Sequence, residues 1–114
     1  KAIARLTKER PVILAGETNL KQLLAIMKRA QLIISADTGP LHLANSLGTD
    51  VIGLFGPTRP EITGPRGQGR FKVLHNDVGC NREPCYYLPC PDNVCMKSIT
   101  VDDVIESVRQ IKNP

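Results

Sequence analysis

The sequence predicts an α/β domain built around a parallel sheet, and two observations carry this prediction. The short segments at 11–16, 32–36, 51–55 and 71–75 are apolar throughout instead of alternating with polar residues, which is typical of parallel strands covered on both faces. The first three segments recur about every twenty residues with a helix-like stretch between neighbours, which is the rhythm of βαβ units. We therefore expect four strands in a Rossmann-like parallel sheet with flanking helices.

Two helices are expected between these strands. The segment 19–30 has apolar residues at helical spacing, and Asn19 with Gln22 three residues later has the form of a capping box. The segment 40–47 has a proline near its start and a glycine just past its end, which is the order that helices favour.

The C-terminal part is expected to be a loop at 76–97 followed by a helix at 101–112. Thr100 is the expected N-cap of this helix. The chain begins with Lys1 inside what looks like the tail of another helix, so we expect it to be part of a longer protein, with further strands of the sheet before Lys1. The apolar stripe expected on the last helix consists of Val101, Val104, Ile105, Val108 and Ile111.

Composition and charge argue against some classes of protein, such as membrane-spanning and nucleic-acid-binding proteins. The chain has 114 residues, one domain's worth or less, with 41% hydrophobic and 23% charged residues, as in an ordinary globular domain. Its apolar runs of about five residues are far too short to cross a membrane. Aromatic residues, at 4%, are too few for the stacking surface of a typical nucleic-acid binder. The net charge is +4, and a basic group in a glycine-rich loop is either a solvated surface or part of a site for a phosphate-bearing ligand: Arg59, Arg66, Arg70 and Lys72.

The stretch ADTGP at 36–40 is the most informative local pattern. It lies where an apolar strand ends and a helix begins, and ligands bind at such carboxyl ends in open α/β sheets. A helix N-terminus leaves backbone N–H groups unpaired and carries a partial positive charge, so it favours a phosphate. Gly39 lets the backbone come close to an anion, and Pro40 near the first helical position loses no intrahelical hydrogen bond.

A phosphate alone does not explain Asp37, because a carboxylate would repel it. Asp37 would suit a sugar whose hydroxyls donate hydrogen bonds beside that phosphate. Alternatively, Asp37 or Thr38 is only the N-cap of the following helix. His42 lies one turn further on, either facing the ligand or as a packed structural residue. A second candidate ligand loop, LFGPTRPEITGP at 54–65, follows the next strand.

In this order, the motifs resemble glycosyltransferase family 9, the ADP-heptose:lipopolysaccharide heptosyltransferases. The resemblance is carried by DTGPLHLANSLG at 37–48 and by LFGPTRPEITGP at 54–65. The preceding AGETNLKQLLAIMKRAQLIIS at 15–35 contains the family's Gly-x-Thr-x-Leu element, and the tail has scattered cysteines that end in CMKSIT at 95–100. The resemblance covers nearly the whole chain.

The resemblance implies a GT-B fold, in which two Rossmann-like domains face a cleft. Residues 1–114 would then be a single, incomplete nucleotide-sugar-binding domain from the C-terminal, donor-binding half. The implied reaction is the transfer of heptose, with inversion, from ADP-heptose to the inner core of lipopolysaccharide, with no other cofactor and no metal. The enzyme would be cytoplasmic, peripheral to the inner membrane, without a transmembrane segment and without a nucleic-acid partner.

The resemblance also implies roles by position. Asp37 would contact the donor sugar, and the backbone at the start of the following helix would hold its diphosphate. The turn at 16–18 would lie near the adenine, and the loop at 55–58 would line the sugar end of the cleft. The substrate-binding residues expected on this basis are Asp37, Thr38, Gly39, Pro40, Leu41, His42, Gly16, Thr18, Gly56, Pro57 and Thr58.

Two parts of the family's machinery have no counterpart in these residues. One is the basic residue that meets the phosphates, and the other is the acceptor domain with the catalytic base. We therefore expect no catalytic residue in this chain and no activity from the chain alone, and lipopolysaccharide would be bound through the other domain.

Four cysteines recur every five residues in the predicted loop, and three interpretations stay open. They could hold zinc, although the familiar paired C-x2-C spacing is absent. They could form disulfides, which would be unusual in a reducing cytoplasm. They could also be small buried residues that organise a long loop. The residues are Cys80, Cys85, Cys90 and Cys95.

Two other functions remain as alternatives. One is a different GT-B enzyme that acts on a nucleotide sugar, such as an epimerase. The other is a non-catalytic metal-binding or nucleic-acid-binding module, which only the cysteines and the basic charge support.

Overall fold

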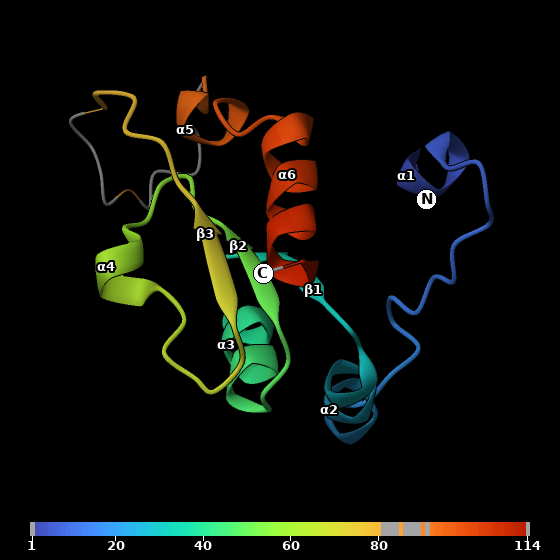
Figure 1. Ribbon diagram of the computed structural model, residues 1–114. Coiled ribbons are helices and arrows are strands. Elements are labelled where there is room, and N and C mark those ends of the chain that lie inside the picture. The colour runs from blue at the N-terminus through green and yellow to red at the C-terminus, as the bar shows by residue number, and fades with distance from the viewer. Residues whose placement is uncertain (1, 81–84, 86–89, 91, 114) are drawn as a thin grey trace.

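The computed structural model describes residues 2–80, 85, 90 and 92–113, and it has a parallel sheet at its centre (Figure 1). The strands are β1 (Ile33–Ala36), β2 (Val51–Leu54) and β3 (Phe71–Leu74), in the order β1-β2-β3. All are parallel, with Ile33 opposite Val51 and Val51 opposite Phe71. This confirms the predicted α/β class with a Rossmann-like parallel sheet.

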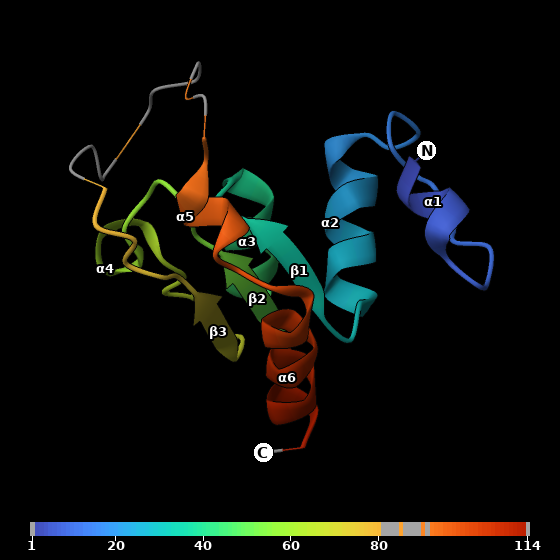
Figure 2. The ribbon, with the colours of Figure 1, turned by 90° about the horizontal axis from the view of Figure 1, so that it is seen from above.

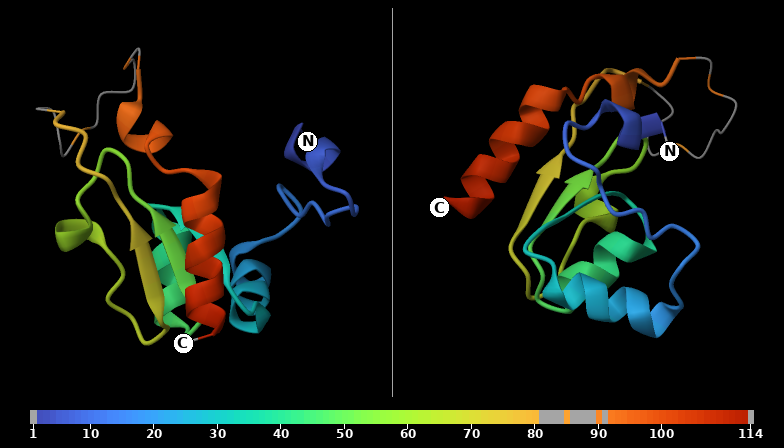
Figure 3. Two further views of the ribbon diagram at one scale, coloured as in Figure 1. Left: turned by 45° about the horizontal axis from the view of Figure 1, so that its top comes forward. Right: turned by 90° about the vertical axis from the view of Figure 1, so that its right-hand side faces the viewer.

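Helices flank the sheet on both faces. α3 packs on β1 and β2 and carries α2 behind it, whereas α6 lies on the opposite face against β2 and β3 (Figure 3). Seen from above, α1 and α2 lie on the side of β1, and α4 lies on the side of β3 (Figure 2). None of the described helices combines the length and the hydropathy that crossing a membrane requires. The helices are α1 (Ala2–Leu6), α2 (Leu20–Arg29), α3 (Gly39–Ser46), α4 (Pro60–Thr63), α5 (Val94–Lys97) and α6 (Val101–Lys112).

Both predicted helix starts are capped as expected. The Asn19 side chain accepts a hydrogen bond from the Gln22 amide, and the Gln22 side chain accepts one from the Asn19 amide, which completes the capping box of α2. Thr100 and Asp103 make the same reciprocal pair at the start of α6. These local signals are strong because each satisfies two N–H groups that a helix start leaves unpaired.

The predicted strand at 11–16 is wrong. Its apolar side chains are exposed: Val12 by 83%, Ile13 by 50% and Leu14 by 43%. A strand needs a neighbour for its backbone hydrogen bonds, and none of the described strands pairs with this segment. It ends instead in a turn in which the Glu17 amide donates to the Leu14 carbonyl. The described sheet therefore has three strands, not four.

Complete burial applies only to the central strand. β2 is buried along nearly its whole length, but Ile34 of β1 is 47% exposed and Phe71 of β3 is 50% exposed. α6 packs mainly on β2 and β3, and both outer strands are edges of the described sheet. The prediction that all strands are covered on both faces was too broad.

Only part of the apolar stripe predicted on α6 is buried. Ile111 is buried, whereas Val101 and Ile105 are 74% and 43% exposed. The helix turns Ser107 toward the sheet instead, with the Ser107 hydroxyl donating to the Asp103 carbonyl.

The hydrophobic core lies between the sheet and the α2–α3 layer. It contains Met27, Leu41, Ala44, Val51 and Phe55, all of them buried. Leu41 follows the loop after β1 and Phe55 begins the loop after β2, and both are fully buried. These two buried side chains therefore anchor the loops at the carboxyl end of the sheet to the core.

Candidate functional site

The loops that follow β1 and β2 meet at the carboxyl end of the sheet, around the side chain of Asp37. The Thr63 hydroxyl donates to Oδ2 of Asp37 at 2.8 Å, across 26 positions of sequence. On the other oxygen, Nε2 of His42 lies 3.2 Å from Oδ1. The Asp37 side chain is 14% exposed and that of His42 is 42% exposed. The two candidate ligand loops are thus brought together as one site.

Thr58 contributes a buried hydroxyl beside Asp37. Its Oγ1 makes no hydrogen bond of good geometry with any described group. The hydroxyl nevertheless lies close enough to the Asp37 carboxylate to lower the pKa of that group. Within the described part of the chain, the Thr58 hydroxyl therefore keeps capacity for a further hydrogen bond.

The environment of Asp37 keeps its carboxyl group ionised. Burial alone would raise its pKa, but the hydroxyls of Thr58 and Thr63, together with the hydrogen bond and charge of His42, outweigh that effect. The pKa of Asp37 is therefore below its usual value of 3.8. At neutral pH the site contains a fixed negative charge whose oxygens accept hydrogen bonds.

The start of α3 is open, and the capping interpretation does not hold. Thr38 occupies the N-cap position, but its side chain makes no hydrogen bond to the helix and donates to the Ala36 carbonyl instead. The Asp37 side chain is bonded to Thr63 and His42. Among the described residues, the N–H groups of Thr38 and Gly39 have no hydrogen-bond partner. A Cβ built on Gly39 would meet nothing within 4 Å, and Gly39 and Pro40 are exposed.

Leu41, which was expected among the substrate-binding residues, lies in the hydrophobic core. Its side chain is fully buried in the core, and its N–H already donates to the Thr38 carbonyl at 3.1 Å. Because Pro40 has no N–H, the unpaired donors at this helix start are those of Thr38 and Gly39.

Other predicted residues lie outside the Asp37 cluster. Gly16 has a φ of 78° in the exposed segment before α2, and neither it nor Thr18 has a hydrogen bond with the cluster in the described part of the chain. Gly56 is buried, and a Cβ there would collide with the side chain of Met96. The Pro57 carbonyl accepts a hydrogen bond from the Cys85 amide at 2.7 Å. Close packing against Met96 is thus one reason for the glycine of the Gly-Pro pair.

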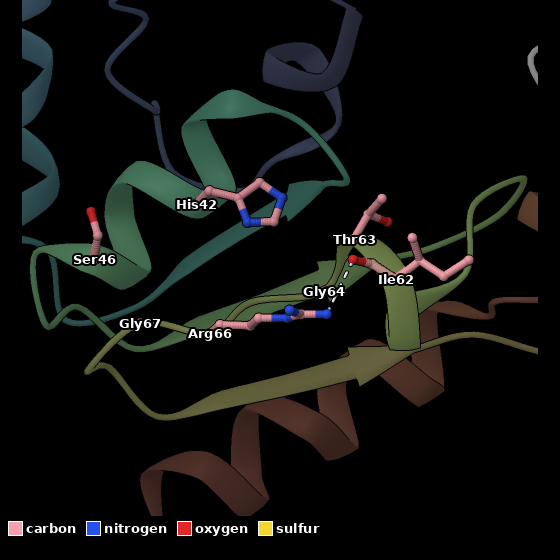
Figure 4. A pocket seen from close by; sticks show the side chains of 7 residues that line it. All are labelled: His42, Ser46, Ile62, Thr63, Gly64, Arg66 and Gly67. Carbon is pink, nitrogen blue, oxygen red and sulfur yellow. Dashed lines mark hydrogen bonds between the residues drawn. The ribbon is translucent and has the colours of Figure 1, made fainter.

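An open pocket of about 580 Å³ lies beside this cluster, and sequence reasoning did not predict it (Figure 4). His42 and Thr63 form the border that the pocket shares with Asp37. The only sequence signals were a hydroxyl and a basic residue inside the glycine-rich loop, and such residues are common in loops. The lining residues are His42, Ser46, Ile62, Thr63, Gly64, Arg66 and Gly67.

The predicted basic group separates into different environments. Arg70 binds Asp50 through Nε at 3.1 Å and Nη2 at 2.7 Å, at the amino end of the sheet. Lys72 donates to Gln110 of α6. Arg66, in contrast, lines the pocket. Arg66, Arg70 and Lys72 therefore do not form one phosphate-binding surface.

The cysteines do not form a buried cluster. Cys80 and Cys90 are exposed, and Cys85 and Cys95 are half-buried. Within the part of the chain that the structure describes, no group of three or more His, Cys, Asp or Glu side chains could hold a metal ion. The interpretation of the cysteines as a set of small buried residues is wrong, because two of the four face solvent.

Comparison with known proteins identifies the family. Residues 1–90 match the model of glycosyltransferase family 9 (heptosyltransferase). Lipooligosaccharide heptosyltransferase 2 of Campylobacter jejuni serotype O:6 is 30% identical over 103 residues, which are 89% of this chain and 32% of the relative. The lipopolysaccharide core heptosyltransferase OpsX of Haemophilus influenzae is 47% identical over 55 residues, 48% of this chain and 16% of that protein. Lipopolysaccharide heptosyltransferase 2 of Escherichia coli is 36% identical over 52 residues, 46% of this chain and 15% of that protein.

No solved structure is significantly similar to this chain. The chain spans about a third of the length of the Campylobacter relative, and less of the other two. The family match covers both loops of the site, and it agrees with the resemblance that the motifs predicted. The chain belongs to glycosyltransferase family 9.

Proposed function

We propose that this chain binds the nucleotide-sugar donor of a heptosyltransferase, as the donor-binding half of a GT-B enzyme that adds heptose to the inner core of lipopolysaccharide. The observation that carries the proposal is the ionised carboxylate of Asp37 directly beside a helix start whose first N–H groups have no partner among the described residues. A sugar diphosphate has both complements in one molecule, because its hydroxyls donate hydrogen bonds and its phosphates accept them.

Asp37 has room for hydrogen bonds from a sugar. A carboxylate has about four lone-pair positions, and Thr63 and His42 occupy one on each oxygen. The remaining positions can accept hydrogen bonds from sugar hydroxyls. The Thr58 hydroxyl, buried and unpaired among the described residues, is a further polar group at this place.

The diphosphate would lie at the N–H groups of Thr38 and Gly39. The partial positive charge of a helix start favours an anion there, and the open space above Gly39 lets the phosphates approach. Oriented N–H groups would also stabilise the nucleoside diphosphate as it leaves, which is the catalytic contribution that this site can make.

The finer assignments rest on membership of the family and on the sequence motifs. The names of the relatives support heptose as the sugar and lipopolysaccharide as the acceptor. ADP as the nucleotide, the turn at Gly16 and Thr18 as the adenine site, inversion by a base outside this chain, and a cytoplasmic location at the inner membrane are parts of the same proposal. An epimerase would share the donor chemistry, but the relatives are named as transferases.

Calorimetric titration with ADP-heptose, ADP and a short oligonucleotide tests the proposal, with Asp37→Ala alongside the unaltered chain. Loss of hydrogen bonds to a charged group should weaken ADP-heptose binding about tenfold or more, and ADP binding less. Asp102→Ala, which removes an exposed carboxylate from the first turn of α6, is the matched control and should bind as the unaltered chain does.

Equal affinity of Asp37→Ala and the unaltered chain for ADP-heptose would contradict the role of Asp37. Tight binding of the oligonucleotide with no response to ADP would favour a nucleic-acid-binding module instead.

A further inference from the structure

We propose that the pocket between α3 and α4 binds an anionic group, a phosphate or a carboxylate, and that Arg66 holds it. The inference goes beyond the proposed function, which places the donor diphosphate at the start of α3 and assigns nothing to this pocket.

The pocket adjoins the sugar-binding carboxylate. In Figure 4 the ring of His42 extends from α3 toward Thr63 on α4, and the Arg66 side chain extends from the following loop into the same space. Both His42 and Thr63 also contact the carboxylate of Asp37. A group in the pocket would therefore be one side chain away from a sugar held by Asp37.

Within the described part of the chain, no acid compensates the charge of Arg66. Its Nη2 lies 3.2 Å from the Glu61 carbonyl oxygen and 3.4 Å from that of Ile62, which are neutral acceptors. No carboxylate of a described residue forms an ion pair with Arg66, and the pocket lining contains no Asp or Glu. A guanidinium has five N–H donors in a planar fork that fits carboxylates and phosphates, so donors remain for a ligand.

The loop that carries Arg66 is fixed to α3. The side chain of Asn45, 1% exposed, accepts a hydrogen bond from the Gly67 amide at 2.5 Å and donates one to the Gly69 carbonyl at 2.8 Å. The Arg66 guanidinium is thus hydrogen-bonded to carbonyls of α4, and the next residue, Gly67, fixes the backbone to α3. Such preorganisation lowers the entropic cost of binding an anion.

The pocket is separate from the proposed diphosphate position. That position uses the first residues of α3, whereas the pocket is lined by His42 and Ser46, which lie one and two turns further along the helix. An anion in the pocket is therefore a different group from the donor diphosphate.

Nuclear magnetic resonance of the labelled 114-residue chain tests the inference, with inorganic phosphate and acetate as separate probes. We expect a saturable change of the Arg66 Nε–Hε signal and of the Gly67 amide signal with at least one probe, and we expect it to persist when ADP is saturating. Arg66→Gln should weaken the binding of that probe, followed at the Gly67 amide, by at least about fivefold. Arg66→Lys keeps the charge and should weaken it less.

Arg70→Gln is the matched control, because it removes an arginine from the same loop but outside the pocket. Its Gly67 response should equal that of the unaltered chain. The inference is overturned if neither probe gives a saturable response, if Arg66→Gln responds as the unaltered chain does, or if ADP abolishes the response.

The failure of the proposed function would look different. ADP-heptose binding that Asp37→Ala leaves unchanged would overturn the donor site, whereas the probe response at Arg66 would not change. Loss of the probe response with intact ADP-heptose binding would overturn only the anion site in the pocket.

Discussion

The two ends of the parallel sheet use polar residues in opposite ways. At the amino end, Asp50 accepts three hydrogen bonds from Arg70, two from the guanidinium and one from the backbone amide, and the buried Asn45 bonds to the next loop. At the carboxyl end, the partners of Asp37 are a hydroxyl and a half-exposed imidazole, and Thr58 has a buried hydroxyl without a described partner. Among the described residues, the polar groups at the amino end bond to one another, whereas the carboxyl end keeps unused hydrogen-bonding capacity.

Glycines show the same contrast. A Cβ on Gly69, near the C-terminal end of α3, would collide with the Thr49 carbonyl oxygen, so packing requires the glycine. A Cβ on Gly39, at the other end of the helix, would meet nothing, and Gly39 has no positive φ. Neither packing nor backbone conformation explains Gly39, whereas the proposed approach of a diphosphate would.

The largest effect on stability is expected for Gly69→Ala. Its methyl group would have to displace the backbone of Thr49, which should lower the free energy of unfolding by about 1–3 kcal/mol. Gly39→Ala should change it by no more than about 0.5 kcal/mol, because the new methyl group is exposed. Urea denaturation of both variants measures the difference, and equal losses would mean that the two ends of α3 do not differ in packing.

Gly39→Ala should nevertheless impair ligand binding. Its methyl group would stand where the proposed diphosphate approaches the N–H groups of Thr38 and Gly39. We expect the affinity for ADP to fall about fivefold, roughly 1 kcal/mol. Calorimetry with ADP measures it, and an unchanged affinity would show that the phosphates lie elsewhere.

Thr58→Val separates binding from folding. The hydroxyl has no hydrogen bond of good geometry among the described residues, but it helps to lower the pKa of Asp37. Its replacement by a methyl group should therefore change the unfolding free energy by no more than about 1 kcal/mol. If the hydroxyl serves a ligand, ADP-heptose should bind more weakly to the same variant. A loss of more than about 1 kcal/mol, measured by urea denaturation, would mean that the hydroxyl has a structural role.

The smallest effect concerns pH. The pKa values of Asp37 and Asp50 are both below 3.8. For Asp37, burial raises the pKa, but the Thr58 and Thr63 hydroxyls and His42 together lower it further. For Asp50, the hydrogen bonds and charge of Arg70 lower the pKa. Between the lowered pKa and the unfolded value, the unfolded chain binds more protons than the native one. Each carboxylate therefore stabilises the fold above about pH 4, and this contribution is lost as the pH falls through the lowered pKa. Asp37→Asn and Asp50→Asn should each flatten the decrease of the unfolding free energy below pH 4.

Salt should distinguish these two carboxylates in the same denaturation series. The ion pair of Asp50 with the exposed Arg70 is screened by salt, whereas hydroxyl hydrogen bonds are affected less. At about 1 M salt the Debye length is only about 3 Å. The contribution of Asp50 to the unfolding free energy should therefore fall more than that of Asp37 when this salt is added. Equal salt effects would argue against the difference in partners.

Local patterns predicted most of the described elements and pointed to the turn around Asp37 as the candidate site. The caps at Asn19 and Thr100 and the turn around Gly39 depend on neighbours within a few residues, so a sequence is sufficient to identify them. The segment 11–16 has the composition of a strand, but strand formation also depends on a partner backbone, which composition does not reveal.

Contacts across the sheet could not be predicted in the same way. Thr63 reaches Asp37 only because β1 and β2 are aligned in register, which brings the loops after them together. Arg66 and Arg70 look alike in one glycine-rich loop, yet Asp50 pairs with Arg70 and leaves Arg66 at the pocket. Such differences depend on three-dimensional position and not on residue type.

Backbone amide signals during titration with ADP-heptose test most directly whether the start of α3 and Asp37 form the donor site. The amides of Thr38 and Gly39 should show the largest changes, and Asp37→Ala should reduce them, while the amide of Arg70, which donates to Asp50, should not move. Changes centred on Arg70 and the amino end of the sheet, or no saturable change at Gly39, would contradict the proposed donor site.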